Sequence, residues 1–314
     1  MALVYWFADG AGEEITRGGS DGKTPIPTAL VRWIRAKGSP SLIVYGGDIY
    51  PAGSSKSFNE FFNQMDGDVR EMCEPPGNHD WKDDPSLPST GRIPHGYDTF
   101  WRAHPESKQP VDITKQGAAR YDHFIDLEGW RLFFVDTGDY DTAAWPAGDA
   151  SRVTWLRTNL KPGRANILFA HHSRLSCGRH GNNDKLDALW QALFDADGTP
   201  RFAFTIAGHD HNVSVYGPRS KEDPEHKSVA FAEGIHVVVN GAGGDGHYSQ
   251  EDALRLLLLV RGEKPDIFAD DDHYFVTRIN LTSATAADVD LLDFGKHAAG
   301  DPAPVPKSLV TIRL

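Results

Sequence analysis

The sequence has few cysteines, no long apolar segment and no excess of basic residues. Only two of the 314 residues are cysteines, Cys73 and Cys177, and neither belongs to a CxxC pair. This argues against a disulfide scaffold and against a closed structural zinc site. The longest apolar runs, such as residues 254–260, are far too short to span a bilayer, so we expect no membrane partner.

The charge balance is acidic, with a formal net charge of −12. This argues against binding to extended nucleic acid, which requires clustered Lys and Arg side chains. We therefore expect a small or local substrate. The first nine residues lack the basic stretch and the cleavage site of a signal peptide, and they predict a buried strand and a cytoplasmic location.

Short apolar runs alternate with helical patterns over most of the chain. The apolar runs predict strands buried on both faces at residues 3–8, 42–45, 132–135, 167–170, 202–207 and 235–239. Helical patterns occupy residues 27–36, with Thr28 as the N-cap, and residues 57–65, 151–160 and 184–194. This alternation predicts an α/β fold with parallel strands, whose carboxyl ends bind the ligand.

The end of the chain is rich in strand-like patterns. These patterns cover residues 274–281, 286–292 and 309–312, and residues 298–306 read as a connector. No repeat or linker interrupts the sequence. We therefore predict a single domain over residues 1–314, in which the β-rich part from about residue 273 to 314 completes the sheets.

Side chains that can bind metal ions follow the predicted strands. They are Asp9, Asp48, Asn78, His171, His209 and His211. Carboxylate, amide oxygen and imidazole together suit Zn, Mn and Fe. An aspartate after a strand is more often a turn former or a helix cap, but two histidines in alternation after an apolar strand have little use in packing.

Two adjacent histidines follow the strand predicted at residues 167–170. On an extended chain their side chains point in opposite directions, so only one of them can face the site. We choose His171 as the ligand and expect His172 to be packed or to lie outside the ligand set.

The order of these motifs resembles the calcineurin-like metallophosphoesterase superfamily, whose pattern is D-x-H or D-x-G, GD, GNH followed by D or E, then H, then GHxH. The match runs from Asp9 to His211. The resemblance implies a four-layer α/β sandwich, in which two mixed β-sheets are flanked by helices. It also implies a hydrolase of phosphoric esters that uses two divalent or mixed-valent ions of Fe, Mn or Zn.

The resemblance assigns roles to individual residues. The implied ligands form two sets that share Asp48: Asp9, Asp48 and His211 for one metal, and Asn78, His171 and His209 for the other. His79 would stabilise charge on the phosphate or protonate the leaving group, and Asp80 would fix its ring.

The closer resemblance is to small, single-domain purple acid phosphatases. Residues 171–181, HHSRLSCGRHG, are similar to their ligand-histidine segment, which implies that His180 faces the substrate. Their GDxxY motif carries an iron-binding tyrosine, but Tyr50 stands one residue early here, and Ala11 stands where many relatives have a histidine. Either Tyr50 or water could complete the first metal site.

These residues predict hydrolysis of a phosphomonoester or phosphodiester by a metal-activated hydroxide. A cyclic nucleotide phosphodiesterase or a nuclease could use the same site. A non-catalytic, protein-binding scaffold of the same fold is the alternative from another class. The scaffold is expected to have lost ligands, whereas Asn78, His79, His209 and His211 are all present, which favours an enzyme.

Overall fold

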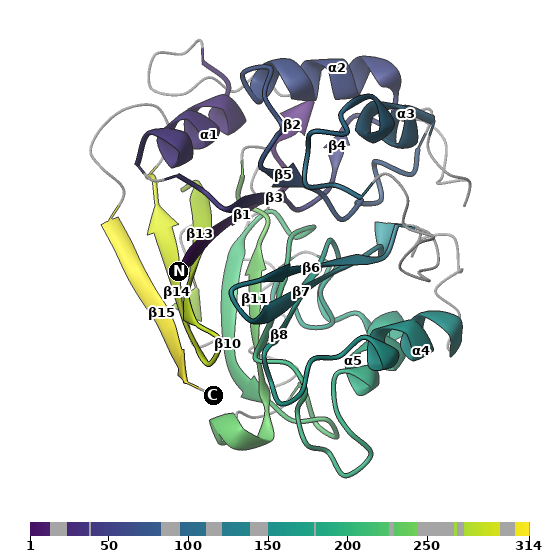
Figure 1. Cartoon of the computed structure of the whole chain (residues 1–314), viewed down its shortest axis with the longest axis vertical. Helices are drawn as coiled ribbons and strands as arrows, with labels where there is room; N and C mark the ends of the chain where they lie inside the picture. Colours follow the sequence, from purple (N-terminus) through teal and green to yellow (C-terminus); the bar gives the residue numbers. More distant parts are fainter. Residues whose placement is uncertain are drawn as a thin grey trace.

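Two β-sheets form the centre of the molecule (Figure 1). The computed structural model describes residues 1–12, 24–37, 39–82, 95–110, 121–138, 150–178, 180–225, 229–243, 267–268, 273–295 and 305–313. One sheet has six strands in the order β15-β14-β13-β1-β3-β5, and the other has seven in the order β12-β10-β11-β9-β8-β7-β6. Both are mixed.

The six-stranded sheet combines the beginning of the chain with its end. Its strands are β1 (Ala2–Phe7), β3 (Leu42–Tyr45), β5 (Met72–Cys73), β13 (Phe275–Ser283), β14 (Ala286–Asp293) and β15 (Val305–Arg313). β1, β3 and β5 are parallel, and β13 pairs with β1 in the antiparallel direction. The β-rich end of the chain thus extends the sheet that begins at the N-terminus.

The seven-stranded sheet is built from the middle of the chain. Its strands are β6 (His123–Leu127), β7 (Trp130–Val135), β8 (Asn166–Ala170), β9 (Phe204–Ala207), β10 (Val213–Arg219), β11 (Ile235–Asn240) and β12 (Ile267–Phe268). β7, β8, β9 and β11 are parallel. A separate two-stranded ladder pairs β2 (Ala11–Gly12) with β4 (Ile49–Tyr50).

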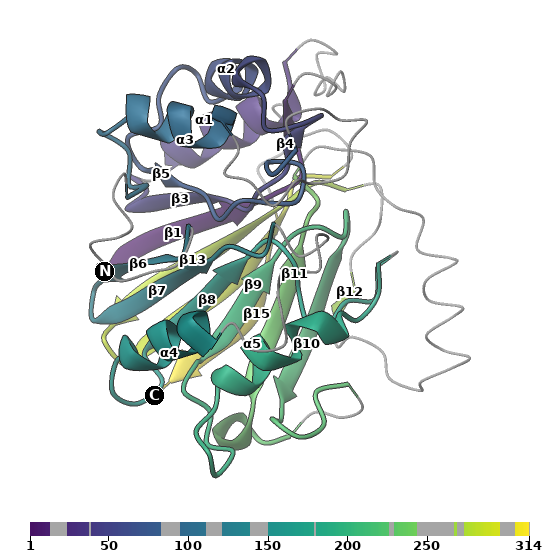
Figure 2. The ribbon, with the colours of Figure 1, turned by 90° about the vertical axis from the view of Figure 1, so that its right-hand side faces the viewer.

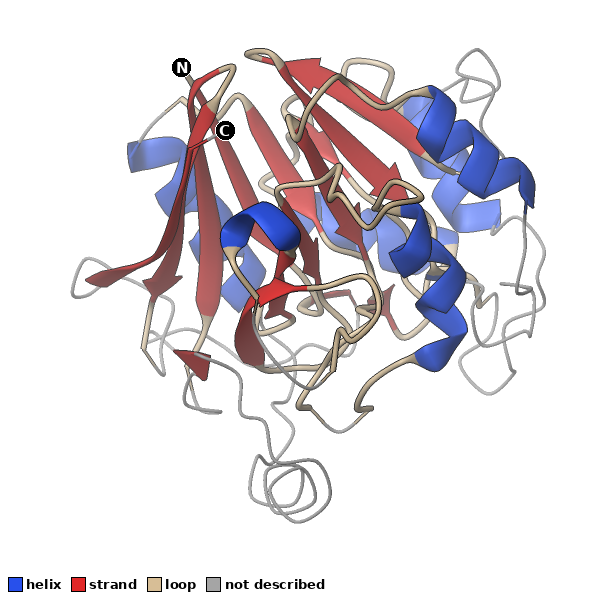
Figure 3. Ribbon diagram, turned by 90° about the horizontal axis from the view of Figure 1, so that it is seen from below, coloured by secondary structure: helices blue, strands red, loops and turns tan. Residues whose placement is uncertain are grey.

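Apolar side chains of both sheets pack between them, and helices cover the outer faces (Figures 2 and 3). The six-stranded sheet is covered by α1 (Ile26–Lys37), α2 (Ser55–Gln64) and α3 (His95–Ala103). The seven-stranded sheet is covered by α4 (Ala150–Thr158) and α5 (Asp187–Ala192). This gives the four layers that the family resemblance implies.

Trp6 shows how the two sheets are joined. Its indole is fully buried in the layer between them and stacks on Phe169 of β8 at 5.7 Å between centroids. Its Nε1 donates to the carbonyl of Asn240 on β11 at 2.9 Å. Burial of a large apolar side chain contributes about 1.5–3 kcal/mol, and the hydrogen bond prevents the cost of a buried, unpaired N–H.

The predicted strands are all present, but some strand and helix boundaries and one helix N-cap differ from the sequence predictions. α1 begins at Ile26, so Thr28 is a buried residue inside the helix and not its N-cap. β15 begins at Val305, earlier than its apolar pattern predicts, because it pairs along the whole of β14. Pro306 is tolerated there because β15 is an edge strand.

Helix α3 was not expected from the sequence, and the apolar run at residues 254–260 lies outside the described residues. Among the described residues, no helix is both long enough and apolar enough to cross a membrane.

His123 is a buried histidine on β6 that should make stability depend on pH. Its ring stacks on Phe134 at 4.7 Å between centroids, and burial lowers its pKa to about 4. In the unfolded chain the pKa is about 6.5, so the unfolded state binds more protons between these values and stability falls as the pH decreases through this window. The expected loss from this group is about 3 kcal/mol.

Urea unfolding of the metal-free protein at pH 7 and pH 4.5 would measure this effect. We expect H123F, which keeps an aromatic ring beside Phe134, to lose about 2 kcal/mol less than the wild type over this interval, because pH 4.5 is still above the pKa of about 4 in the folded state. An equal loss in both proteins would show that His123 does not cause the acid sensitivity.

Candidate metal centre

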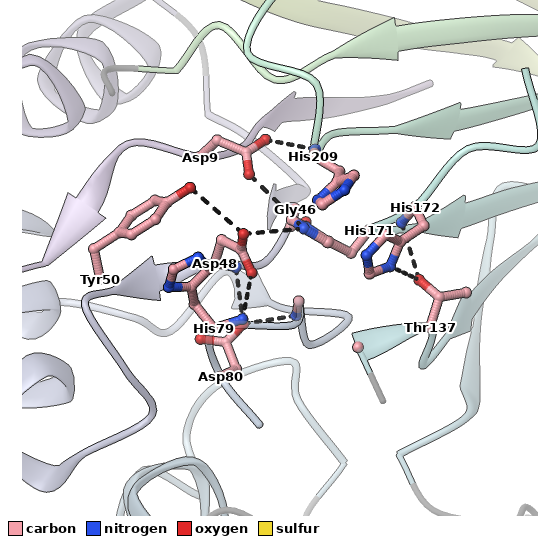
Figure 4. Close-up of polar contacts among 12 residues, drawn as sticks. Asp9, Gly46, Asp48, Tyr50, His79, Asp80, Thr137, His171, His172 and His209 are labelled. Carbon is pink, nitrogen blue, oxygen red and sulfur yellow. Dashed lines mark hydrogen bonds and ion pairs between the residues drawn. The ribbon is translucent and has the colours of Figure 1, made fainter. Parts of the chain in front are cut away.

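The predicted ligands converge where parallel strands of both sheets end (Figure 4). Asp9 follows β1, and Asp48 follows β3. His171 follows β8 of the other sheet, and His209 and His211 follow β9. Because these strands end at one edge of the sandwich, ligands more than 200 residues apart in the chain come within a few ångströms of one another.

Three of these residues lie in the left-handed backbone region. The φ angles are +58° for Asp9, +64° for Asp48 and +68° for His209. This conformation is uncommon outside glycine, and it persists where the surrounding structure fixes the chain. One such contact is the hydrogen bond from the His209 amide to Asp9 Oδ2, at 2.8 Å. The loops therefore turn sharply enough to direct the side chains of Asp9 and His209 into the cluster.

One group of possible metal-binding atoms includes the carboxylates of both aspartates. Single donor atoms of Asp9, Asp48 and His171 lie within 4.8 Å of one another. His171 Nε2 is 3.2 Å from Asp48 Oδ2 and 3.9 Å from Asp9 Oδ1, and His211 Nε2 is also 3.9 Å from Asp9 Oδ1. The structure therefore brings the two carboxylates together with the histidines of both expected sets.

Tyr50 reaches the same cluster. Its hydroxyl is 2.9 Å from His211 Nε2 and 3.5 Å from Asp48 Oδ2. The tyrosine lies on β4, whose pairing with β2 buries Ile49 in the helix-covered core and leaves Tyr50 on the side of the aspartates. Tyr50 follows Asp48 by one residue fewer than the tyrosine of the GDxxY motif follows its aspartate. The phenol nevertheless reaches the site.

A second group of donor atoms consists of imidazoles. Single ring nitrogens of His171, His172 and His209 lie within 4.8 Å of one another. Asn78 is buried near them, and within the described part of the chain its Oδ1 accepts no hydrogen bond. His171 Nδ1 donates to the carbonyl of Gly46 at 2.8 Å, which leaves Nε2 on the side of the aspartates.

The expectation that only one of the adjacent histidines can face the site is wrong. Alternation of side chains holds only within a strand, and β8 ends at Ala170. Residues 171 and 172 form a bend, so His172 lies 4.7 Å from His171 and 4.2 Å from His209, measured between ring centroids. In the sequence, the apolar run ends at Ala170, and this end indicated that strand alternation no longer applies to residues 171 and 172.

His79 lies at the edge of the cluster. The expectation that Asp80 fixes the ring of His79 is wrong. Nδ1 of His79 is 2.8 Å from the carbonyl of Pro51. Asp80 instead accepts hydrogen bonds from the backbone amides of Asp48, Ile49 and Gly77 at 2.7–2.9 Å. Asp80 therefore positions the loops that carry the ligands, and it does not orient the histidine.

Gly77 lies against Asp48. A Cβ at this position would collide with Asp48 Oδ1, so the close approach of the two loops requires glycine. The same carboxylate oxygen accepts the amide of His79 at 2.8 Å. Both contacts fix the Asp48 carboxylate in the middle of the cluster.

An open cleft of about 400 Å³ lies beside the imidazoles. His79, Lys82, Ser173, Ser176, His180 and His209 are among the residues that line it. His180 is exposed, its ring lies tilted beside that of His209 with 4.1 Å between centroids, and its backbone amide donates to Asp210 Oδ1 at 2.9 Å. The structure thus places His180 at the entrance to the cluster.

The buried charges show that the cluster attracts a cation. Burial tends to raise the pKa of Asp48, but His171 and His79 outweigh it and hold that pKa well below its usual range. Burial tends to lower the pKa of His171, but Asp48 and Asp9 raise it to about 10. A proton on His171 then supplies the positive charge that a metal ion would bring.

The residues present fit metal ions. The carboxylates, imidazoles, phenol and amide oxygen are ligands that Fe, Mn and Zn accept, and the buried Asn78 Oδ1 without a donor is the kind of atom that a cation satisfies. The ring nitrogen of His171 that does not face the cluster is hydrogen-bonded to a carbonyl, as is usual for metal-binding histidines.

Tyr45 joins two of the ligand loops, a role that no sequence motif indicates. Its buried hydroxyl accepts the amides of Gly10 and Ala11 at 3.1 and 3.0 Å and donates to the carbonyl of Asp48 at 2.9 Å. Burial raises the pKa of Tyr45 well above its usual value, so the hydroxyl keeps its proton. The loops after β1 and β3 are thus fixed to one atom.

We expect Y45F to weaken metal binding about tenfold and to destabilise the protein by about 1–3 kcal/mol, because three buried backbone groups lose their partner. Titration of the metal-free protein with Zn²⁺, together with urea unfolding, would measure both effects. Y97F is the matched control, because the buried Tyr97 hydroxyl donates to the carbonyl of Glu74 and accepts from Gln109, so it bonds neither the loop after β1 nor the loop after β3. Equal zinc affinity in the two variants would contradict this role.

A sequence model of one family matches residues 21–213, more than half of the chain, and its description is calcineurin-like phosphoesterase. The chain belongs to the calcineurin-like phosphoesterase family. The resemblance inferred from the motifs is therefore confirmed, and the matched segment contains every expected ligand except Asp9. No curated protein matches this calcineurin-like phosphoesterase in sequence.

Solved structures support the fold of this calcineurin-like phosphoesterase. It is similar to the purple acid phosphatase PPD1 from yellow lupin (Lupinus luteus) seeds, with a TM-score of 0.60 and 14% identity over 98% of this chain and 53% of that chain. The chain thus spans about half the length of the lupin enzyme. A predicted phosphoesterase from Streptococcus pneumoniae TIGR4 matches over 98% of both chains at 11% identity, but its TM-score is only 0.35.

Proposed function

We propose that this calcineurin-like phosphoesterase hydrolyses small phosphate esters at a site that holds two metal ions. The observation that carries the proposal is the pair of overlapping donor groups, one around Asp9 and Asp48 and the other around His209, which share His171. Beside them lies an open cleft with His79 and His180 on its wall. Family membership supports the same reaction class.

The chain offers a ligand set to each ion. Asp9, Asp48, His211 and Tyr50 would hold the first, and Asp48, Asn78, His171 and His209 would hold the second. Ions of Fe, Mn or Zn fit these donors. When bound, two cations neutralise the negative phosphoryl oxygens and make the attacking water more acidic.

His79 is the residue best placed to serve the leaving group. Its Nδ1 faces a carbonyl oxygen, which can only accept, so Nδ1 carries a proton and Nε2 is the nitrogen that would transfer one. Hydrolysis breaks the bond from phosphorus to the ester oxygen, and the alkoxide must gain the equivalent of the proton that the attacking water loses. His79 would donate that proton, and His180 would contact the phosphate or the leaving group from the cleft wall.

A small ester is the substrate class that suits the cleft. Its volume of about 400 Å³ can hold a phosphate and a leaving group of moderate size. The polar wall, which includes Lys82, Ser173 and Ser176, favours a polar leaving group. The acidic net charge argues against a long polyanion as the partner.

Assays after reconstitution with Mn, Zn, Fe or Co would test the proposal. The protein, first freed of metal by chelation, would be offered chromogenic phosphomonoesters and phosphodiesters, including a cyclic nucleotide. We expect metal-dependent release of the chromogen from at least one ester class. Inactivity with every metal and every ester would contradict the proposal and would favour a binding scaffold.

A further inference from the structure

We propose that His172 is an additional metal ligand, which gives the second ion of this site a third imidazole. The inference rests on the proposed dinuclear function. It starts from the position of the ring, which lies beside the rings of His171 and His209 (Figure 4).

The distances place His172 within reach of the same ion as its neighbours. One ring nitrogen each of His171, His172 and His209 lies within 4.8 Å of the other two. Nitrogens that each lie 2.0–2.1 Å from one ion cannot be more than about 4.2 Å apart, so the observed spread requires only a small closure around the cation. Asn78 Oδ1 and Asp48 complete a set of oxygen and nitrogen donors.

Thr137 holds His172 in this position. Its Oγ1 accepts the backbone amide of His172 at 2.9 Å and lies 3.1 Å from Nδ1 of the ring. The backbone and one ring nitrogen are thus fixed to a single hydroxyl, and Nε2 is the nitrogen that would bind the ion. A hydrogen bond to the ring nitrogen opposite the metal is the usual arrangement for a histidine ligand.

A histidine used only for packing has different surroundings in this molecule. His123 is equally buried, but its ring stacks on Phe134 within the apolar layer between the sheets. The neighbours of His172 are two other imidazoles, and this buried residue is among those that line the polar cleft together with His180. A shared cation should stabilise three clustered imidazoles that have little access to bulk water, because it binds ring nitrogens that water does not reach.

The third imidazole should change which metal is preferred. Imidazole suits Zn, Fe and Co, whereas carboxylate and water suit Mn, so the second ion should be bound more selectively as Zn²⁺ when His172 is present. Removal of one nitrogen donor should weaken that binding step by at least about tenfold. The first ion, held by the group around Asp9, should be affected less.

Zinc titration of metal-free protein against a chromogenic chelator would test this inference, with H172N as the variant. Asparagine can still bond the Thr137 hydroxyl, so the backbone bend is retained. We expect the wild type to bind two Zn²⁺, and H172N to bind the second at least about tenfold more weakly, with a smaller preference for Zn over Mn. H123N, which changes a buried histidine on β6, two strands away from β8, should leave both zinc constants unchanged.

The outcomes separate the two proposals. If the wild type binds fewer than two Zn²⁺, the dinuclear function fails; if it binds two and H172N binds both equally well, only the role of His172 is overturned. Should H172N not fold, anomalous diffraction from zinc-soaked wild-type crystals decides the matter. A zinc peak about 2.0–2.1 Å from His172 Nε2 supports the inference, and a distance above about 3 Å overturns it.

Discussion

Replacement of Asp48 by asparagine is expected to lower the rate of ester hydrolysis at least about a thousandfold. Oδ2 of this carboxylate is 3.2 Å from His171 Nε2 and 3.5 Å from the Tyr50 hydroxyl, so it lies between the two donor groups. The amide of asparagine cannot neutralise two cations. A loss of about 4 kcal/mol of charge stabilisation in the transition state corresponds to about a thousandfold in rate.

The D48N result can be separated from a general loss of structure. D290N is the matched control, because Asp290 on β14 forms an ion pair with Arg278 on the neighbouring strand β13. We expect D290N to keep its rate within about twofold, since a pair of this kind contributes about 0–1 kcal/mol to stability. D48N that is folded by circular dichroism and retains most of its activity would contradict the central position of this carboxylate.

Replacement of His79 by asparagine should reduce turnover about 10²–10⁴-fold while two metal ions remain bound. The ring lies beside the ligands, and its Nδ1 is fixed by the Pro51 carbonyl, so the change removes a proton donor and no proposed ligand. An alkyl phosphate has a poor leaving group that needs a proton, whereas a nitrophenyl phosphate does not. The loss should therefore be greater for the alkyl ester. Steady-state rates with both esters, together with the metal content of the variant, measure this.

H180N is the comparison for H79N. His180 is exposed on the cleft wall, so its contribution to turnover should be smaller than that of His79 and similar for both esters. An equal loss for good and poor leaving groups in H79N would exclude a proton-transfer role. Loss of metal from H79N would show that the residue supports the ligands instead.

The sequence predicted the ligands better than the contacts that hold them. Asp9, Asp48, His171 and His209 follow strands with clear apolar patterns, so the rule that ligands lie at strand ends brought them together. The role of Tyr45 depends on the approach of two loops that are separated in the chain, which a local pattern does not contain. These roles as metal ligands remain predictions until metal is measured.

The strands of the fold also differ in how well the sequence predicts them. The apolar runs of β1, β3, β7 and β8 were recognised because strands buried on both faces have continuous apolar sequences. Strands such as β2, β4 and β5, with two residues each, are too short to carry a pattern and form only because neighbouring loops meet. Tyr50 reaches the cluster through one of these short ladders, so its position could not be derived from motif spacing.

The most direct test is a titration of metal-free protein in which the rate of ester hydrolysis is followed as metal is added. Two cooperating ions predict little activity at one equivalent and full activity at two, with no further gain beyond that point. Activity that reaches its maximum at one equivalent, or that never depends on metal, would contradict a dinuclear site at Asp48.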